Sequence, residues 1–317
     1  MPKIKMLLKD LWSITKKSAI AWNEADPFRQ SAVVAYYAIF SMPALLVILI
    51  ACAGFFFGQE AVRGEIAGQI ASVMGKDTAV QIQDMIAKAT NHKNTVLAAI
   101  ISIGTLILGC TGVFEELQVS LNQIWEVKVV AKKKWLKSLK DRLFSFGLIL
   151  SIGFLLLVSL VLTTILTALS GWIKNHLPDF VLTIFHALDF VISFGVITVL
   201  FALMFKILPD AKVKWKNVWI GAIVTALLFI VGKFGLGIYF GKTQPASAYG
   251  AAGSIILVML WVSYSCMIVF FGAEFTKQFT FHYGGKIEPT KDAEHIETSE
   301  EEQLVKDKKE AVKQVKN

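Results

Sequence analysis

The chain has 317 residues, 55% of them hydrophobic, and a mean hydropathy of +0.59. It contains six apolar runs of 19 residues or more. A soluble domain would not carry them, because about 20 helical residues at a rise of about 1.5 Å each cross a hydrocarbon core of about 30 Å. The net charge of +8 is compatible with binding to nucleic acid or to anionic lipid. The distribution of the basic residues along the chain distinguishes these two partners.

Residues 1–32 form the first predicted unit, a cytoplasmic amphipathic segment. Apolar residues recur among lysines at helical spacing: Ile4, Leu7, Leu8, Leu11, Ile14 and Trp22. We expect a helix that lies on the inner leaflet. The segment is not a signal peptide, because the first apolar run is too long and lacks a small-residue cleavage site.

The six apolar runs make up a predicted transmembrane domain over residues 33–283. They are Val33–Phe57, Thr95–Val113, Leu143–Leu169, Phe180–Leu208, Asn217–Phe240 and Tyr249–Phe275. The runs do not alternate in polarity as barrel strands do. The predicted fold class is therefore all-α: a polytopic membrane bundle of six transmembrane helices with interfacial amphipathic helices. Pro43 lacks a backbone donor and is predicted to kink the first helix.

Three further segments lie outside the runs. The outer loop 58–94 carries two amphipathic stretches, which predict two short helices that form a lid or, alternatively, a plug. After the second run an interfacial or re-entrant helix is expected, with one apolar face made of Phe114, Leu117, Leu121, Ile124 and Trp125. The charged tail 284–317 is predicted to be a disordered cytoplasmic segment, with a loose helix over 299–315 as the alternative.

The distribution of basic residues predicts orientation. The N-terminal segment and the connections after the second and fourth runs hold 17 Lys and Arg residues, whereas the alternate connections hold 6. The positive-inside rule then places both termini in the cytoplasm of a multi-pass bacterial inner-membrane protein. Orientation and anionic lipid account for the basic charge, so no nucleic acid partner is expected.

Several short motifs together resemble one family. They are AYYAIFSMP from Ala35 to Pro43, LNQIWEV from Leu121 to Val127, LPDAKVKW from Leu208 to Trp215, YGAAG from Tyr249 to Gly253, and FGAE from Phe271 to Glu274. In this order they resemble the YihY/BrkB family, formerly labelled ribonuclease BN, over roughly residues 20–280. The resemblance implies a six-helix inner-membrane protein without a settled activity, for which transport of lipids or small solutes is the leading idea.

Two charges lie inside the apolar runs and away from their ends. Asp189 and Lys233 are each predicted about 6–8 Å to the outer side of the membrane midplane. Consecutive helices are usually neighbours, so an Asp189–Lys233 ion pair is expected, with His186 on the same face as the aspartate. Four interpretations stay open: a substrate or proton site, simple neutralisation of buried charge, a lysine that reaches outward to water, or no interaction between the two residues.

Other candidate residues lie along the same helices. At the inner ends, Glu274 stands out within the FGAE motif, beside Glu115, Glu116 and Lys206, which could also serve only as interfacial charge. Tyr36, Tyr37 and Ser41 offer polar groups before the kink, or an aromatic belt at the interface. Gly235 and Gly237 predict a hinge, and Gly237 with Gly241 alternatively predicts close helix packing.

These observations predict a transporter or flippase, not driven by ATP, for an amphiphile or small anionic solute. The alternative is a structural scaffold of the cell envelope. A ribonuclease is disfavoured, because the five histidines are scattered and no carboxylate-rich motif accompanies them. We expect no enzyme activity, no cofactor and no metal; the expected partners are the lipid bilayer, a lipid or small-solute substrate and, as an open alternative, further copies of the chain.

Overall fold

The computed structural model describes residues 2–74, 79–80, 82–84, 112–130, 179–243 and 253–296. Three helices within these ranges are long and apolar enough to cross a membrane. They are the stretch Phe190–Ile207 of α7 (Asp179–Ile207), α8 (Trp215–Thr243) and the stretch Ile255–His282 of α9 (Gly253–His282). The protein is therefore a helical membrane protein with several candidate spans. The predicted span Leu143–Leu169 and nearly all of Thr95–Val113 lie outside the described residues.

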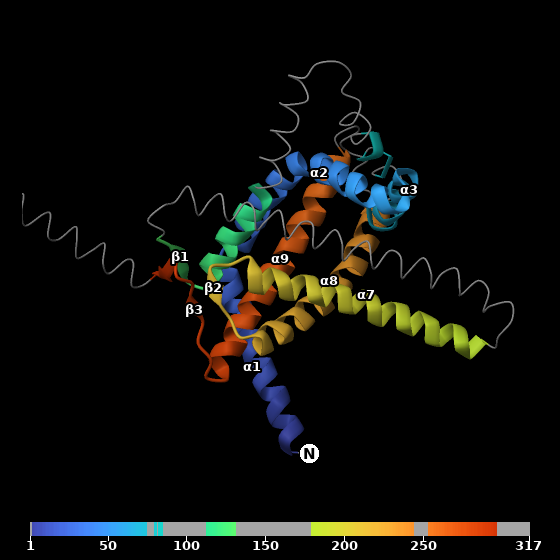
Figure 1. Ribbon diagram of the computed structural model, residues 1–317. Coiled ribbons are helices and arrows are strands. Elements are labelled where there is room, and N and C mark those ends of the chain that lie inside the picture. Colours follow the sequence, from blue (N-terminus) through green and yellow to red (C-terminus); the bar gives the residue numbers. More distant parts are fainter. Residues whose placement is uncertain are drawn as a thin grey trace, which may run out of the picture.

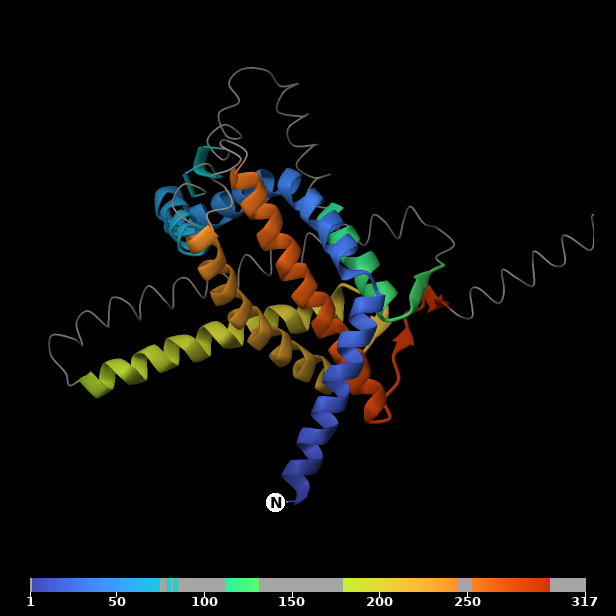
Figure 2. The ribbon, with the colours of Figure 1, turned by 180° about the vertical axis from the view of Figure 1, so that it is seen from behind.

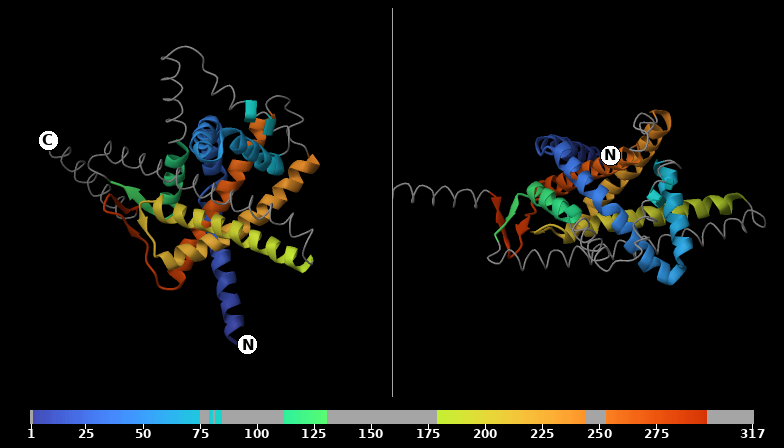
Figure 3. Two further views of the ribbon diagram at one scale, coloured as in Figure 1. Left: turned by 45° about the vertical axis from the view of Figure 1, so that its right-hand side comes forward. Right: turned by 90° about the horizontal axis from the view of Figure 1, so that it is seen from above.

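Helix α9 packs against both α2 (Pro27–Phe57) and α8, and the three helices reach the same end of the molecule near α3 (Figures 1 and 2). α2 continues across Pro43 as one helix that bends between its ends. α7 packs on α8, and the two helices diverge toward the start of α7 and the end of α8 (Figures 1 and 3).

The predicted N-terminal helix is confirmed as α1 (Pro2–Glu24). Its buried face, with Ile14 and Ser18 nearly inaccessible, packs along α9. At its last turns Trp22 donates its indole N–H to the Met267 carbonyl at 3.0 Å and meets Phe271 edge-on. The junction between α1 and α2 therefore lies beside the middle of α9. Its predicted position on the inner leaflet stays a prediction.

At the C-terminal end of α2, α3 (Gln59–Met74) confirms the first of the two predicted outer helices. The second is helical at residues 79–80 and 82–84, and its remaining residues lie outside the described ranges. Ile82 and Val62 pack with Ile50 of α2 and Val258 of α9 in a small apolar cluster. These helices therefore rest on the ends of α2 and α9, in the manner of a lid.

The larger apolar core surrounds the helical residues 112–124. The predicted apolar face of this helix is confirmed, because all five of its members are buried: Phe114, Leu117, Leu121, Ile124 and Trp125. This face packs against the end of α7 and against α8 and α9. The helix 112–124 thus lies at the centre of this core.

Close packing of α8 on α9 depends on two reciprocal glycine–threonine contacts. A Cβ added at Gly221 of α8 would overlap the Thr276 hydroxyl of α9, and one added at Gly272 of α9 would overlap the Thr225 hydroxyl of α8. Each threonine also donates to the carbonyl four residues earlier in its own helix, at 2.7 Å. The hydroxyls are satisfied locally, and glycine opposite each one lets the helices approach closely.

The structure adds four short strands that the all-α prediction did not include. β1 (Val127–Val129) pairs antiparallel with β4 (Ala293–His295), and β2 (Ala211–Lys212) pairs with β3 (Glu288–Pro289). They gather at one end of the molecule, away from α3 (Figures 1 and 3). The tail was predicted to be disordered from residue 284, but its residues through 296 are held by these pairings. Residues 297–317, with the alternative helix 299–315, lie outside the described ranges.

Candidate functional site

Residues of two separate motifs meet at the end of the bundle where the four strands gather. The Asn122 side chain donates to Asp210 Oδ2 at 2.9 Å and accepts from the Asp210 backbone N–H at 2.8 Å. Gln118, one turn before Asn122, donates to the same carboxylate oxygen at 3.0 Å. Both Asn122 and Asp210 are buried. A buried carboxylate is costly without partners, and these amides stabilise the turn between α7 and α8.

The neighbouring Trp125 connects the same helix to α9. Its side chain is 2% exposed, lies edge-on to Phe205 of α7 and points its indole N–H at the Ala273 carbonyl, 3.4 Å away. Ala273 belongs to the FGAE motif. The motifs that carry the family resemblance, LNQIWEV, LPDAKVKW and FGAE, are therefore assembled into one contact region.

A second charged group, the acid–lysine cluster, consists of Glu126, Glu274 and Lys277. Lys277 Nζ lies 2.8 Å from Glu126 Oε1 and 3.9 Å from Glu274 Oε1. Glu274 is 2% exposed and Lys277 is 8% exposed. Glu274 Oε2 has no hydrogen-bond partner among the described residues. One buried carboxylate oxygen is thus left for a proton, a cation or a donor group of a ligand.

Backbone geometry positions this cluster. Glu126 has a left-handed φ of 57°, which ends the helix at residue 124 and turns the chain into β1. Its carbonyl accepts from the Ile296 N–H at 3.0 Å, so the strands of the tail hold the turn in place. A non-glycine residue in this region costs free energy, and the contacts to Lys277 and Ile296 offset that cost.

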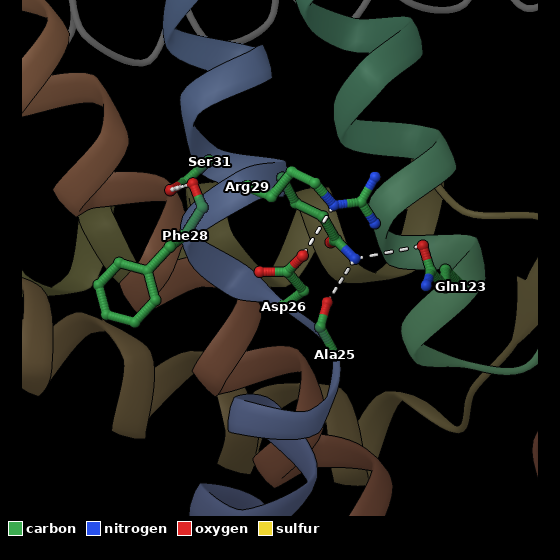
Figure 4. A network of polar contacts seen from close by, with 7 residues as sticks. Ala25, Asp26, Phe28, Arg29, Ser31 and Gln123 are labelled. Atoms are coloured by element: carbon green, nitrogen blue, oxygen red, sulfur yellow. Dashed lines mark hydrogen bonds and ion pairs between the residues drawn. The ribbon is translucent and has the colours of Figure 1, made fainter.

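The junction of α1 and α2 is a third polar feature (Figure 4). Asp26 has a left-handed φ of 53° and pairs with Arg29 at 2.8 Å. Gln30 donates to the Ala25 carbonyl at 2.8 Å and to Gln123 Oε1 at 3.2 Å, so its amide bridges the junction to the helix 112–124. Gln30 Oε1 is buried without a partner in the described part of the chain.

On the other side of this junction lies an apolar cavity of about 460 Å³. Trp22 and Phe28 line it from α1 and α2, Gly232 from α8, and Tyr264 and Phe271 from α9. Figure 4 shows Phe28 directed away from Arg29 and Gln123. The first turn of α2 thus separates an apolar cavity from a polar network.

The predicted Asp189–Lys233 pair stays a prediction. Asp189 and His186 belong to α7, but their side chains lie outside the described residues. Lys233 belongs to α8 and is exposed.

Other predicted residues are distributed more widely. Tyr36 and Tyr37 are exposed on α2, and the Tyr37 ring packs where a Cβ on Gly112 would lie. Ser41 is buried and donates to the Ala38 carbonyl at 3.2 Å. α8 is unbroken through Gly235 and Gly237. An added Cβ at Gly237 or Gly241 would meet no atom of the described residues within 4 Å, so the close α8–α9 packing uses Gly221 and Gly272 instead.

Glu116 and Lys206, two other charges predicted at the inner ends of the helices, have separate environments. Burial raises the pKa of the Glu116 carboxyl; repulsion from Glu115 adds to the rise, and the Arg29 charge opposes it. Lys206 donates to the Val213 carbonyl at 2.6 Å and lies over the Trp215 ring, so it ties the end of α7 to the start of α8.

Sequence reasoning missed Asn122, Asp210, Glu126 and Lys277 as site residues. The first three lie within motifs that the sequence displays, but nothing in a single sequence says that those motifs touch. Lys277 follows Glu274 at i+3, a spacing that predicts contact on a helix, and this signal was available in the FGAE region.

Comparison with known proteins agrees with this assembly of motifs. The family model described as Virulence factor BrkB matches residues 20–297, which include β3 and β4. UPF0761 membrane proteins of Verminephrobacter eiseniae and Tolumonas auensis are 31% and 30% identical, over 50% and 58% of this chain and 36% and 58% of their own lengths. One from Pseudoalteromonas translucida is 25% identical over 77% of this chain and 78% of its own length.

The chain spans about half the length of the first relatives it matches, with 36%, 58% and 55% of their residues aligned. No solved structure matches the chain. The family match covers most of the sequence and all three motifs that meet in this contact region. The chain therefore belongs to the Virulence factor BrkB family of membrane proteins.

Proposed function

We propose that the chain is a six-helix protein of the bacterial cytoplasmic membrane that moves an amphiphile or a small anionic solute without ATP. α7, α8 and α9 supply three of the six spans, and the apolar runs at 33–57, 95–113 and 143–169 supply the others. The excess of Lys and Arg on alternate connections supports cytoplasmic termini.

The observation that carries this proposal is the unpartnered Oε2 of Glu274 within a candidate span. A carboxylate in an apolar helix is expensive, and proteins that keep one commonly use it for a substrate or a coupling ion. Its one nearby cation, among the described residues, is Lys277, which lies 1.1 Å closer to Glu126 (3.9 Å against 2.8 Å). A protein that served only as a scaffold would have no need to hold Glu274 in this incompletely paired state.

The cluster offers a simple coupling device. Lys277 Nζ lies at the distance of a strong ion pair from Glu126 only, 2.8 Å against 3.9 Å to Glu274, so its position would respond to the charge of each carboxylate. Protonation of Glu274, or binding of a cation there, would remove the attraction of Lys277 to Glu274, so Lys277 would pair with Glu126 alone. An anionic group arriving at Lys277 would instead compete with Glu126, whose side chain is 55% exposed. Either event changes the contacts of α9 with the turn that precedes β1.

A reconstitution experiment tests the proposal. Purified full-length protein in liposomes is tested with fluorescent phospholipids for flipping and with a panel of small organic anions for uptake. Protein-dependent movement of either class supports transport. Absence of movement for all of them, with the protein folded and correctly inserted, would favour the scaffold alternative. Metal-dependent cleavage of RNA by the same preparation would contradict both.

A further inference from the structure

The apolar cavity beside the α1–α2 junction has the dimensions and lining of a binding site. Its volume of about 460 Å³ lies within the range of about 300–1,000 Å³ that is usual for ligand pockets. Its walls come from α1 and α2 on one side and from α8 and α9 on the other. The cavity is therefore formed by segments that are far apart in the sequence.

The lining favours an apolar ligand. The Trp22 indole N–H already donates to the Met267 carbonyl, so this donor is not free to bind anything else. The Tyr264 hydroxyl packs against Gly232, where an added Cβ would come within 2.5 Å of it. The charged pair Asp26–Arg29 and the Gln30–Gln123 bond lie on the far side of the first turn of α2 from Phe28 (Figure 4). The remaining walls are hydrocarbon and aromatic rings.

The cavity is also continuous with a surface suited to lipid. Leu228 and Val231 of α8 line it and are 37% and 69% exposed. Leu227 and Phe234, on the same helix, are 50% and 68% exposed. α8 is long and apolar enough to cross a membrane, and in that position these side chains face the hydrocarbon of the bilayer. A lipid chain can then enter the cavity sideways without passing through water.

We propose that this cavity binds one hydrocarbon chain of a membrane lipid. The proposal rests on the proposed function and narrows its substrate to an amphiphile, with the chain held between Phe28 and Tyr264 and the head group outside the cavity. Transfer of the chain from the bilayer into the cavity keeps it in apolar surroundings. Affinity therefore comes from packing against the aromatic rings, as it does between helices in lipid.

Photolabelling tests the site. The full-length protein is placed in nanodiscs that contain phosphatidylglycerol with a diazirine in one acyl chain, and labelled peptides are identified by mass spectrometry. We expect labelling to be enriched in the segments 228–232 and 264–271 over the other exposed apolar parts of α8. Uniform labelling of every exposed apolar segment would mean surrounding lipid only and would overturn the proposal.

Adjacent leucines provide matched variants. Leu228→Trp fills the cavity, whereas Leu227→Trp makes the same change at a neighbouring position that does not line it. We expect Leu228→Trp to lose most of the labelling at 264–271 and Leu227→Trp to retain it. Met267→Trp, which fills the cavity from α9, gives the same test if Leu228→Trp fails to fold. Retained labelling in a folded, cavity-filled variant would overturn the proposal.

The outcomes separate this site from the transport function. Enriched labelling together with neither flipping nor anion uptake in liposomes would support the chain site and contradict the proposed transport. Flipping or anion uptake that continues without enriched labelling of the cavity would support transport and contradict the chain site.

Discussion

Asn122 and Asp210 exchange two hydrogen bonds across 88 residues of sequence, one from each partner. The carbonyl of Asp210 also accepts from the Thr290 N–H at 2.9 Å. Three chain segments thus meet at Asp210: the helix 112–124, the turn after α7 and the ordered part of the tail. This junction holds the ordered tail segment that follows α9 beside the helix 112–124.

The reciprocal pair predicts a swap experiment. Asn122→Asp places two carboxylates together in a buried site, and we expect it to destabilise the protein by about 3–5 kcal/mol, more than Asn122→Ala at about 1–3 kcal/mol. Adding Asp210→Asn restores a donor and an acceptor and should recover part of the loss. Thermal unfolding in detergent measures the relative stability of these variants. If the double variant is less stable than Asn122→Asp alone, the pairing is not what stabilises this junction.

Breaking the acid–lysine cluster should also be costly. Lys277→Met leaves Glu274 buried without its cation, and we expect a loss of about 3 kcal/mol, at the low end for a broken buried pair because Glu126 can turn to water. Combining it with Glu274→Gln removes the uncompensated charge and should recover much of that loss. Lys212→Met, an exposed lysine on β2, is the control and should change little. A double variant as unstable as Lys277→Met would contradict the ion-pair interpretation.

Helix packing makes a contrasting prediction for glycines. Gly221→Ala and Gly272→Ala should separate α8 from α9 and lower the unfolding temperature, since each Cβ overlaps a threonine hydroxyl. Gly235→Ala should be neutral or stabilising by about 0.5–1 kcal/mol, because alanine favours the helix. Gly221→Ala combined with Thr276→Gly is expected to regain stability. Equal effects at positions 221 and 235 would argue against close packing.

Much of this arrangement follows from local patterns in the sequence. The helical period exposed the face from Phe114 to Trp125, and the long apolar runs located α7, α8 and α9. The strands escaped prediction because pairings of two or three residues carry no periodic signal. The meeting of Asn122 with Asp210 escaped for another reason: it depends on how α7 and the helix 112–124 pack, which no local pattern encodes.

The Asp189–Lys233 pair has its own test. If the two charges pair, Asp189→Asn alone leaves Lys233 without a counter-charge and should impair transport more than Asp189→Asn combined with Lys233→Met. Initial transport rates in proteoliposomes provide the comparison. A double variant whose loss equals the sum of the two single losses would show that the residues act independently.

The raised pKa of Glu116 predicts that the stability of the protein depends on pH. The pKa of this residue is raised in the folded protein, chiefly by burial, so ionising it costs the folded state more than the unfolded chain. That cost is absent below its ordinary pKa of 4.5, develops as the pH rises from there toward the folded pKa, and is complete above the folded pKa. Glu116→Gln should therefore raise the unfolding temperature near neutral pH and leave it unchanged well below pH 4.5. The exposed Glu288→Gln is the control, and equal shifts in both variants would contradict the burial effect.

The most direct test of the transport proposal compares two glutamates in the same reconstituted assay. Once a transported amphiphile or anion has been identified with the wild-type protein, Glu274→Gln and Glu288→Gln are inserted at equal density and their initial rates are measured. If the carboxylate of Glu274, with its unpartnered Oε2, takes part in coupling or binding, Glu274→Gln loses most of the transport rate and the dependence of that rate on pH. Glu288→Gln behaves as wild type. A folded Glu274→Gln variant that transports at the wild-type rate with an unchanged pH profile would contradict the account.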